Sequence, residues 1–459
     1  MTATANLGAR LSEAAGTEHV ITAGEELASY AIDGIVPGAI VRPASAEVAA
    51  KTVRLAAAEK LGLLALGSRS KCEIGMTPSR YDIALDMTGL REIAHYDASD
   101  MTLSVDAGMP LRELEIFLKR HGQFLPLAVP CFESTTAGGV IASGIDSSLR
   151  MQYGGARDFL IGAEFVDGTG QLCKSGGRVV KNVTGYDLHK LLIGSLGTLG
   201  VITRVNFRTF PLAAMSGGHV AAFANCESAL AYRKSVEKAA LPLGNLEVLS
   251  PEVVRMIRAI LQRNEAKMPE SLERKEWLVY CSYEGNHAVV RRISQDLERM
   301  AGEASASHNE LLETAADESL GGMLREAYEW MRWAAPATMI CRLVLPEVTT
   351  GILKELSRLV EGNVVRSALL VRAVGILYFA AFAEEESEPV MAALTNIAAD
   401  AKSLAASNNG DATLLHAPTE LKARLAASRS ESGFAFQQRI KLAFDPSSVF
   451  APGRIVGGL

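Results

Sequence analysis

The feature that most constrains this chain is a stretch rich in small residues between Ser134 and Pro211. It opens with STTAGGVIASG at 134–144, continues with YGGARDFLIGAEFVDGTG at 153–170 and ends with GYDLHKLLIGSLGTLGVITRVNFRTFP at 185–211. Small side chains let the backbone come close to a ligand and offer its N–H groups. Loops of this kind are suited to holding a pyrophosphate.

Two common phosphate-binding fingerprints do not account for this stretch. A G-x-G-x-x-G fingerprint would follow one strand, open one helix and precede an acidic residue, and a P-loop would read G-x-x-x-x-G-K-[ST]. The sequence has no P-loop, and its glycines do not follow the order that the first fingerprint requires. The spacing therefore predicts another kind of nucleotide fold.

Composition sets the scale of the molecule. The 459 residues are 48% hydrophobic and 21% charged, which predicts a large buried core spread over two or three domains. A net charge of −6 without a dense Lys/Arg run gives no support for a nucleic-acid interface. The N-terminus has no signal-peptide pattern, and no apolar run reaches the ~18 residues of a membrane span. We therefore expect a cytoplasmic protein that could still associate with a membrane through its partners.

The six cysteines are scattered and form no C-x-x-C pair. This spacing argues against an iron–sulfur or zinc site built by this chain alone, so no metal site is predicted. Reduced, buried thiols are the expected state of these cysteines.

A first candidate loop follows a strand and precedes the small-residue stretch. Residues 46–62 have helical apolar spacing that ends at Gly62, and the apolar run LLAL at 63–66 predicts a buried strand. The strand leads into Gly67, Ser68, Arg69, Ser70 and Lys71, whose hydroxyls and two cations suit a diphosphate. An ordinary surface turn is the alternative interpretation of this loop.

A second loop, at 134–139, and a third loop, at 197–201, lie inside the stretch itself. Their hydroxyls can satisfy phosphate or ribose oxygens, and their glycines let the backbone approach adenine or ribose. We expect all three loops to converge on one extended nucleotide. The candidates from these loops are Ser134, Thr135, Thr136, Gly138, Gly139, Gly144, Gly154, Gly197, Thr198, Gly200, Val201 and Ile202, and a turn is predicted at Lys181 and Asn182.

The order of these pieces resembles the FAD-binding domain of the vanillyl-alcohol oxidase and para-cresol methylhydroxylase (PCMH) superfamily. GYDL with GSLGTLGVIT at 185–203 and the ending FDPSSVFAPGR at 444–454 carry the resemblance, which extends within the superfamily to the E-subunit family of glycolate oxidase. The resemblance implies FAD as cofactor, bound without a covalent link because the first loop has no histidine. Ser68 and Arg69 stand where similar proteins carry glycines, so this departure could weaken flavin binding.

The resemblance and the alternating elements together predict an α+β fold with a PCMH-type two-subdomain FAD-binding domain, a ferredoxin-like α+β cap and a C-terminal return segment. Strands and helices alternate over 217–303 and partly recur over 336–408, which predicts an antiparallel cap sheet covered by helices on one face. Residues 308–336 are expected to be helical, with Trp330 and Trp333 packed in the core. The predicted division is a lead-in at 1–36, the FAD-binding domain at 37–213, the cap at 214–410 and a C-terminal segment at 411–459.

For function, the resemblance implies an FAD-dependent oxidoreductase subunit that belongs to a complex oxidising a 2-hydroxy acid such as glycolate. Similar catalytic subunits carry a His-rich metal motif, and here no H-x-G-D-G or paired-His segment occurs, while His416 stands alone. The expected partners are a catalytic flavin subunit and an iron–sulfur subunit.

Two alternatives stay open. A free-standing FAD-dependent dehydrogenase of glycolate or D-lactate would need a cation for the substrate carboxylate, and Arg342 and Arg454 are the weak candidates. A scaffold that keeps the fold for assembly without binding flavin is also conceivable, because of the replaced glycines at 68 and 69.

Overall fold

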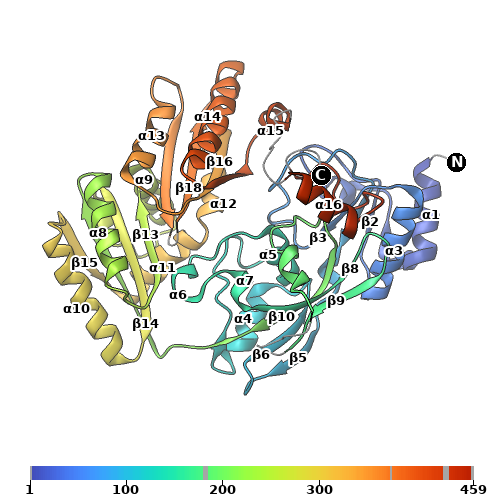
Figure 1. Ribbon diagram of the computed structural model, residues 1–459, viewed down its shortest axis with the longest axis horizontal. Helices are drawn as coiled ribbons and strands as arrows, with labels where there is room; N and C mark the ends of the chain where they lie inside the picture. The colour runs from blue at the N-terminus through green and yellow to red at the C-terminus, as the bar shows by residue number, and fades with distance from the viewer. Residues whose placement is uncertain (1–2, 179–184, 373–374, 427–433, 456–459) are drawn as a thin grey trace.

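The computed structural model describes residues 3–178, 185–372, 375–426 and 434–455. The turn predicted at Lys181 and Asn182 lies outside these ranges. Figure 1 shows two lobes: the blue to green half of the chain joins the dark red C-terminal helix in one lobe, and the yellow and orange elements form the other. The first is called the loop lobe below, because it carries the three candidate loops, and the second is called the cap.

A four-stranded sheet with strand order β1-β2-β4-β3 forms the first part of the loop lobe. Strands β2, β4 and β3 run parallel, and apolar clusters cover both faces of the sheet, as continuous apolar runs such as LLAL predict. The elements are α1 (Ala3–Ala15), β1 (Val20–Ile21), β2 (Ala39–Val41), α3 (Ala46–Glu59), β3 (Leu63–Leu66) and β4 (Ile83–Asp86).

The end of α3 differs from the prediction. Lys60, with φ of 57°, takes the left-handed position that ends the helix, two residues before Gly62. A Cβ on Gly62 would lie 2.5 Å from the carbonyl oxygen of Arg80, so this glycine lets two backbone segments approach each other.

A five-stranded antiparallel sheet with order β5-β6-β10-β8-β9 forms the second part of the loop lobe. Its neighbour α5 packs its apolar side against this sheet and begins inside the predicted second loop. The elements are β5 (Ile93–Asp97), β6 (Thr102–Asp106), α4 (Leu111–Lys119), β7 (Gln123–Phe124), α5 (Ala137–Ser143), α6 (Arg150–Tyr153), α7 (Ala156–Phe159), β8 (Leu160–Val166), β9 (Leu172–Gly176), β10 (Val201–Arg208) and β11 (Phe210–Pro211), which pairs with β7.

The cap is one eight-stranded antiparallel sheet of order β15-β12-β14-β13-β17-β18-β16-β19. The second half follows a β-α-β-β-α-β order, and the first half follows the same order with one additional helix, α9, between its second and third strands. The halves join where β13 pairs with β17, so the weak duplication seen in the sequence is a pair of ferredoxin-like units. The elements are β12 (Met215–Phe223), α8 (Cys226–Lys238), β13 (Leu243–Leu249), α9 (Pro251–Arg263), β14 (Trp277–Gly285), α10 (His287–Glu303), β15 (His308–Leu312), α11 (Thr314–Arg325), α12 (Ala327–Arg332), β16 (Ala337–Val344), α13 (Thr350–Val360), β17 (Arg366–Arg372), β18 (Ile376–Ala383), α14 (Glu388–Ser407) and β19 (Asp411–His416).

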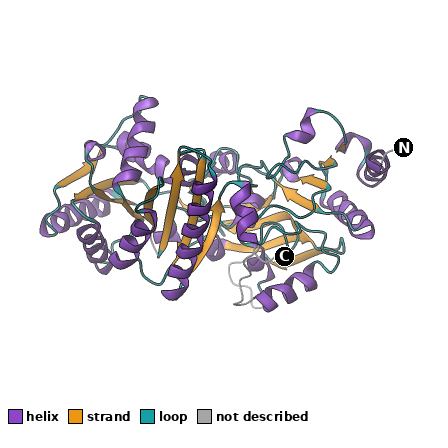
Figure 2. Ribbon diagram, turned by 90° about the horizontal axis from the view of Figure 1, so that it is seen from above, coloured by secondary structure: helices purple, strands orange, loops and turns teal. Residues whose placement is uncertain are grey.

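The two faces of the cap sheet are both covered, which corrects the expectation of helices on one face. Successive strand residues point to opposite faces, and in β18 Leu377 and Phe379 pack with α8, α10, α13 and α14. Tyr378 and Ala380 face the other way, into a cluster that includes α9, α11, α12 and the loop lobe. Figure 2 shows helices on either side of the cap strands.

Two segments of the cap differ from the sequence-based expectation. Residues 308–312, predicted as helix, form strand β15 beside β12. Strand β19 begins at Asp411 and pairs with β16, so we propose that the cap extends to His416 and not to 410. Of the two tryptophans expected in the core, Trp330 packs against it, whereas Trp333 is 69% exposed.

The C-terminal segment returns to the loop lobe. Leu63 of β3 bridges to Phe450, and the backbone N–H groups of Val449 and Phe450 donate to the buried carboxylate of Asp445. Two helices, α15 (Thr419–Ala426) and α16 (Phe434–Phe444), precede this return. The FDP…PGR ending therefore packs beside β3, the edge strand of the four-stranded sheet.

Candidate cofactor site

The three candidate loops meet between the two sheets of the loop lobe. A Cβ on Gly67 would lie 2.2 Å from Thr136 Oγ1, and the hydroxyls of Ser70 and Thr135 are 3.4 Å apart. Gly197 of the third loop lines the same space as Gly67 and Thr136. Segments separated by up to 130 positions in the sequence thus share one cleft, which is called the loop cleft below.

The loop cleft consists of two adjoining hollows, a larger one and a smaller one. Both are lined by Ala65, Leu66, Gly67, Thr136, Gly139 and Ala142. The larger hollow also includes Ser68, Arg69, Ser70, Lys71, Cys72, Thr135 and Arg454, and the smaller one includes Met87, Ala107, Gly138, Gly197, Gly200 and Ile202. Hydroxyls and cations line the larger hollow, and mostly small or apolar residues line the smaller one, a combination that suits a nucleotide.

The first loop presents backbone donors. Within the described part of the chain, the N–H groups of Ser68, Arg69 and Ser70 have no hydrogen-bond acceptor. Arg69 is left-handed, with φ of 65°, and a left-handed residue inside a loop is how successive N–H groups come to face one concavity that binds an anion.

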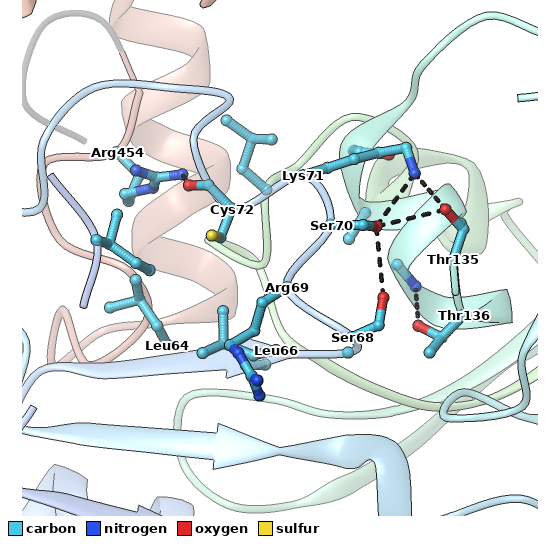
Figure 3. Close-up of a pocket in the computed structure, with 17 residues that line it drawn as sticks. Leu64, Leu66, Ser68, Arg69, Ser70, Lys71, Cys72, Thr135, Thr136 and Arg454 are labelled. Atoms are coloured by element: carbon cyan, nitrogen blue, oxygen red, sulfur yellow. Dashed lines mark hydrogen bonds between the residues drawn. The ribbon is translucent and has the colours of Figure 1, made fainter. Parts of the chain in front are cut away.

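The side chain of Arg69 neither caps nor crowds this concavity. Its guanidinium carbon lies 4.0 Å from the centre of the Tyr30 ring, which is a cation–π contact. In Figure 3, Arg69 points away from the group formed by Ser70, Lys71 and Thr135. The departure from glycine at 69 therefore leaves room for a ligand.

Lys71 is the cation inside the cleft. Its ammonium group donates to Thr135 Oγ1 and, at 3.4 Å, to Ser70 Oγ, and its side chain is buried. Burial lowers the pKa of Lys71 to about 8, and Cys131, Glu326 and Glu329 act in the opposite direction. The amine is therefore positioned to gain a full charge when an anion enters.

The second and third loops are held by internal contacts. Thr136 caps α5, because its Oγ1 accepts the N–H of Gly139 at 3.1 Å. A Cβ on Gly138 would lie 2.7 Å from the Cβ of Ala107, so the small residue lets the second loop approach β6. The carbonyl of Thr198 accepts a hydrogen bond from buried Lys441, which ties the third loop to α16.

Several predicted residues lie outside the loop cleft. Ser134 is exposed, Gly144 ends α5 in the left-handed region, and Gly154 ends α6 with φ of 76°. Thr198 is fully buried and borders a neighbouring groove, and Val201 packs in the core under α3. These residues shape the loops and do not line the cleft.

The two arginines suggested as carboxylate clamps are both engaged. Arg342 reaches from β16 to the loop lobe, where it donates at 3.1 Å to Gly144 O and to Asp146. Arg454 lines the cleft, and its guanidinium donates to the carbonyls of Met76, Cys72 and Ile74. Their contacts give both arginines a structural role.

Sequence reasoning missed a group of charged residues where the cap meets the loop cleft. Glu326 and Glu329 contact Cys131, and Arg332 donates to Glu73 at 3.0 Å. A hydrogen bond from His416 is the main reason that the pKa of Glu73 is lowered to about 2, while burial raises the pKa of Cys131 to about 12. The signal available in the sequence was only the charge pattern of α12, which also fits a solvent-exposed helix.

The cysteines are all free thiols, but only Cys281 and Cys341 are buried. The other four are partly exposed, which corrects the prediction that all would be buried, and Cys72 and Cys131 lie beside the cleft. Among the described residues, no group of three or more His, Cys, Asp or Glu is arranged to hold a metal ion. In the same part of the chain, no helix has both the length and the apolarity needed to cross a bilayer.

Comparison with known families shows which cofactor the protein uses. Residues 219–455, more than half of the chain, match the family model described as FAD linked oxidases, C-terminal domain. This chain is an FAD-linked oxidase family member. Residues 37–176 match the model described as FAD binding domain. The fold is of the PCMH type, and the protein is an FAD-linked oxidoreductase.

Curated relatives of this FAD-linked oxidase include two glycolate oxidase subunits. Subunit GlcE of Escherichia coli is 36% identical over 160 residues, which cover 35% of this chain and 45% of that protein. Subunit GlcD of Bacillus subtilis is 22% identical over 424 residues, 92% of this chain and 89% of that protein. The chain spans less than half the length of the first curated relatives it matches.

Among solved structures, p-cresol methylhydroxylase superposes with a TM-score of 0.77 at 14% identity, covering 99% of this chain and 97% of that one. The superposition shows the shared fold. The loop cleft of this FAD-linked oxidase fits the cofactor, because its free N–H groups and Lys71 suit a diphosphate and its apolar part suits an aromatic base.

Proposed function

We propose that this protein is the E-type FAD-binding subunit of a glycolate oxidase-type complex, which oxidises a 2-hydroxy acid to a 2-oxo acid. In this proposal FAD lies in the loop cleft, and electrons pass through it between a catalytic flavin subunit and an iron–sulfur subunit in the cytoplasm. The similarity of the N-terminal part to GlcE supports the subunit assignment.

The observation that carries the proposal is the state of the arginines around the cleft. A 2-hydroxy acid needs a cation for its carboxylate, and arginine does this best through two parallel hydrogen bonds. Here Arg332 is paired with Glu73 and Glu329, and Arg342 is paired with Asp146. Arg325 is paired with Glu326 and Arg372 with Glu247, while Arg454 donates to three carbonyls. Arg69, which has no ion pair with a described residue, lies over the ring of Tyr30.

FAD, when bound, can accept a hydride or two single electrons and release them one at a time. The chain's own contribution is binding and insulation. Ser68, Arg69 and Ser70 supply N–H donors for the phosphates, and Lys71 supplies charge. The cap closes the far side, with its buried face packed on the loop lobe.

Copurification from the native organism tests the subunit assignment. Tagged protein should be yellow and should recover a second flavoprotein together with a Cys-rich iron–sulfur protein, and the purified chain alone should not be reduced by glycolate. A tagged chain with Gly67→Ala serves as a control for cofactor dependence. Recovery of yellow protein without partners, reduced directly by glycolate, would contradict the proposal.

The free-standing dehydrogenase is the second candidate. It is favoured by one observation: within the described residues, Lys71 makes no ion pair with a carboxylate, so it could serve a substrate anion. Reduction of the isolated chain by glycolate or D-lactate would select this candidate. The open cleft and its unpaired donors speak against the third possibility, a scaffold without flavin.

A further inference from the structure

Two carboxylates of the cap contact the turn that leads into the second loop. Glu326, between α11 and α12, accepts the backbone N–H of Cys131 at 2.5 Å and that of Phe132 at 3.4 Å. Glu329, one turn later, accepts the Cys131 thiol at 3.1 Å. Cys131 has φ of 53°, a left-handed conformation that costs a non-glycine residue free energy, so these contacts help to hold it.

Cys131 in turn organises the second loop. Its carbonyl accepts the N–H of Ser134 at 3.1 Å, the N–H of Thr135 at 2.9 Å and the Thr135 hydroxyl at 2.8 Å. Thr135 Oγ1 is also the acceptor for the ammonium group of Lys71. A continuous path of contacts therefore runs from Glu326 on the cap to the cation in the loop cleft.

The same cap segment also holds the end of the first loop. Arg332 donates to Glu73 and to Glu329, each at 3.0 Å, and Glu73 lies two residues after Lys71. Arg325 lies over the ring of Phe132 with 5.0 Å between its guanidinium carbon and the ring centre. Residues 325–332 thus contact the flanks of both loops that line the larger hollow.

We propose that Glu326 and Glu329 form a clamp through which the cap controls how tightly FAD is retained. The inference rests on the proposed location of FAD in the loop cleft. With the clamp closed, Cys131 fixes Thr135 and thereby Lys71 around the cofactor. FAD dissociates only after Glu326 and Glu329 lose their contacts with the turn at Cys131. The two are therefore positioning residues and not catalytic ones.

The rate of FAD release from the purified holoprotein tests the clamp. Glu326→Gln keeps the shape and removes the charge, and charge-assisted hydrogen bonds are the strong ones. We expect FAD release, followed by flavin fluorescence after dilution, to accelerate about tenfold in Glu326→Gln, as the loss of one ~1.4 kcal/mol interaction implies. Glu329→Gln should accelerate release about threefold, because it weakens one thiol contact and one ion pair.

Glu318→Gln is the matched control, because Glu318 is exposed on α11 and makes none of these contacts. A second readout is the unfolding midpoint of the apoprotein, which a purely structural role would lower in parallel with FAD retention. Because the Glu326 contacts also exist without FAD, the midpoint should fall somewhat, and release that accelerates more in Glu326→Gln than in Arg366→Met, relative to the fall of the apoprotein midpoint in each, supports the clamp. Release at the wild-type rate in both variants overturns it, even if the midpoint falls.

If Glu326→Gln does not fold, Cys131→Ala carries the test, since it removes the thiol contact with Glu329 and a longer one with the carbonyl of Ser70, and it should also accelerate release about threefold. If both single variants, Cys131→Ala and Glu329→Gln, release FAD at the wild-type rate, the clamp is overturned. Failure to recover partner subunits would count against the proposed function and leave this result unaffected.

Discussion

The two sides of the loop cleft differ in whether their polar groups are already paired with other groups of the protein. On the loop-lobe side, the N–H groups of Ser68, Arg69 and Ser70 have no acceptor among the described residues, and small residues keep the space open. On the cap side, Arg332 and Arg342 are each bound to carboxylates. One side is prepared for an anionic cofactor, and the other has its cations neutralised before any substrate arrives.

Under the proposed function, this difference accounts for a flavin-binding subunit that holds the cofactor and leaves the substrate to a partner. Binding a small anion requires a cation that is free, whereas a cation paired inside the protein contributes to folding. The predictions below test each side in turn, from the largest expected effect to the smallest.

The strongest test of the cap side is Arg372→Met. The Arg372 and Glu247 side chains are both buried, with 2.8 Å between Nε and Oε1, so removing the cation leaves an unpaired buried carboxylate. We expect the free energy of unfolding, measured by chemical denaturation of the apoprotein, to fall by about 4 kcal/mol. The exposed pair Arg366–Glu384 is the control, and Arg366→Met should cost less than about 1 kcal/mol. Equal effects would mean that the buried pair is not structural.

Gly67→Ala tests the loop-lobe side. The added Cβ would lie 2.2 Å from Thr136 Oγ1, so Thr136 must move away from the helix it caps. We expect FAD affinity, measured by titration of the apoprotein, to fall by about 100-fold, since overpacking costs up to ~3 kcal/mol. At Gly177 a Cβ meets no atom within 4 Å, so Gly177→Ala should bind FAD normally. Unchanged binding in Gly67→Ala would place the cofactor elsewhere.

The charge of Lys71 should make FAD binding depend on pH. Its pKa of about 8 in the apoprotein is lowered mainly by burial, and a bound diphosphate would raise it. Affinity should therefore fall as pH rises through about 8, by at most about tenfold per pH unit. Lys71→Met should bind more weakly and lose this step.

The lowered pKa of Lys71 affects the folding stability of the apoprotein in the opposite direction to FAD affinity. Lys71 releases its proton near pH 8 in the folded state and near 10.5 in the unfolded state. The unfolded state then holds more protons between these values, so the contribution of Lys71 to stability should increase with pH across that window. Denaturation curves of wild type and Lys71→Met at several pH values would show whether the difference between them changes in this direction.

The smallest effect is expected from Arg69→Gly. This change removes a cation–π contact with Tyr30 and also the cost of a left-handed arginine, two contributions of about 1 kcal/mol each that oppose one another. FAD affinity should therefore stay within about threefold of wild type. A large loss would show that the guanidinium reaches the phosphates, and a large gain would show that it obstructs them.

Much of the fold follows from local patterns in the sequence. The LLAL run gave strand β3, and the alternating elements after residue 214 gave the paired halves of the cap sheet. The 308–312 strand was missed because HNELL carries no apolar alternation and gains its place only by pairing with β12. Lys60 could end α3 in place of Gly62 because an unbranched side chain can take a single left-handed position at a cost of roughly 1–2 kcal/mol.

The candidate site was likewise predicted only in part. Gly67, Ser70, Thr135 and Gly138 could be found because close backbone approach demands small or hydroxyl side chains at the loop itself. The sequence identified Arg342 as a candidate but could not show that it is paired, since its partner Asp146 lies 196 positions away.

The sequence by itself determined the three loops, the order of elements and the FAD-linked family, because these depend on residues near one another along the chain. Tertiary structure alone decided that the arginines of the cap are neutralised and that Glu326 and Glu329 reach the turn at Cys131. The physical reason is that the charge available to a ligand depends on which distant carboxylate lies within a few ångströms of each cation.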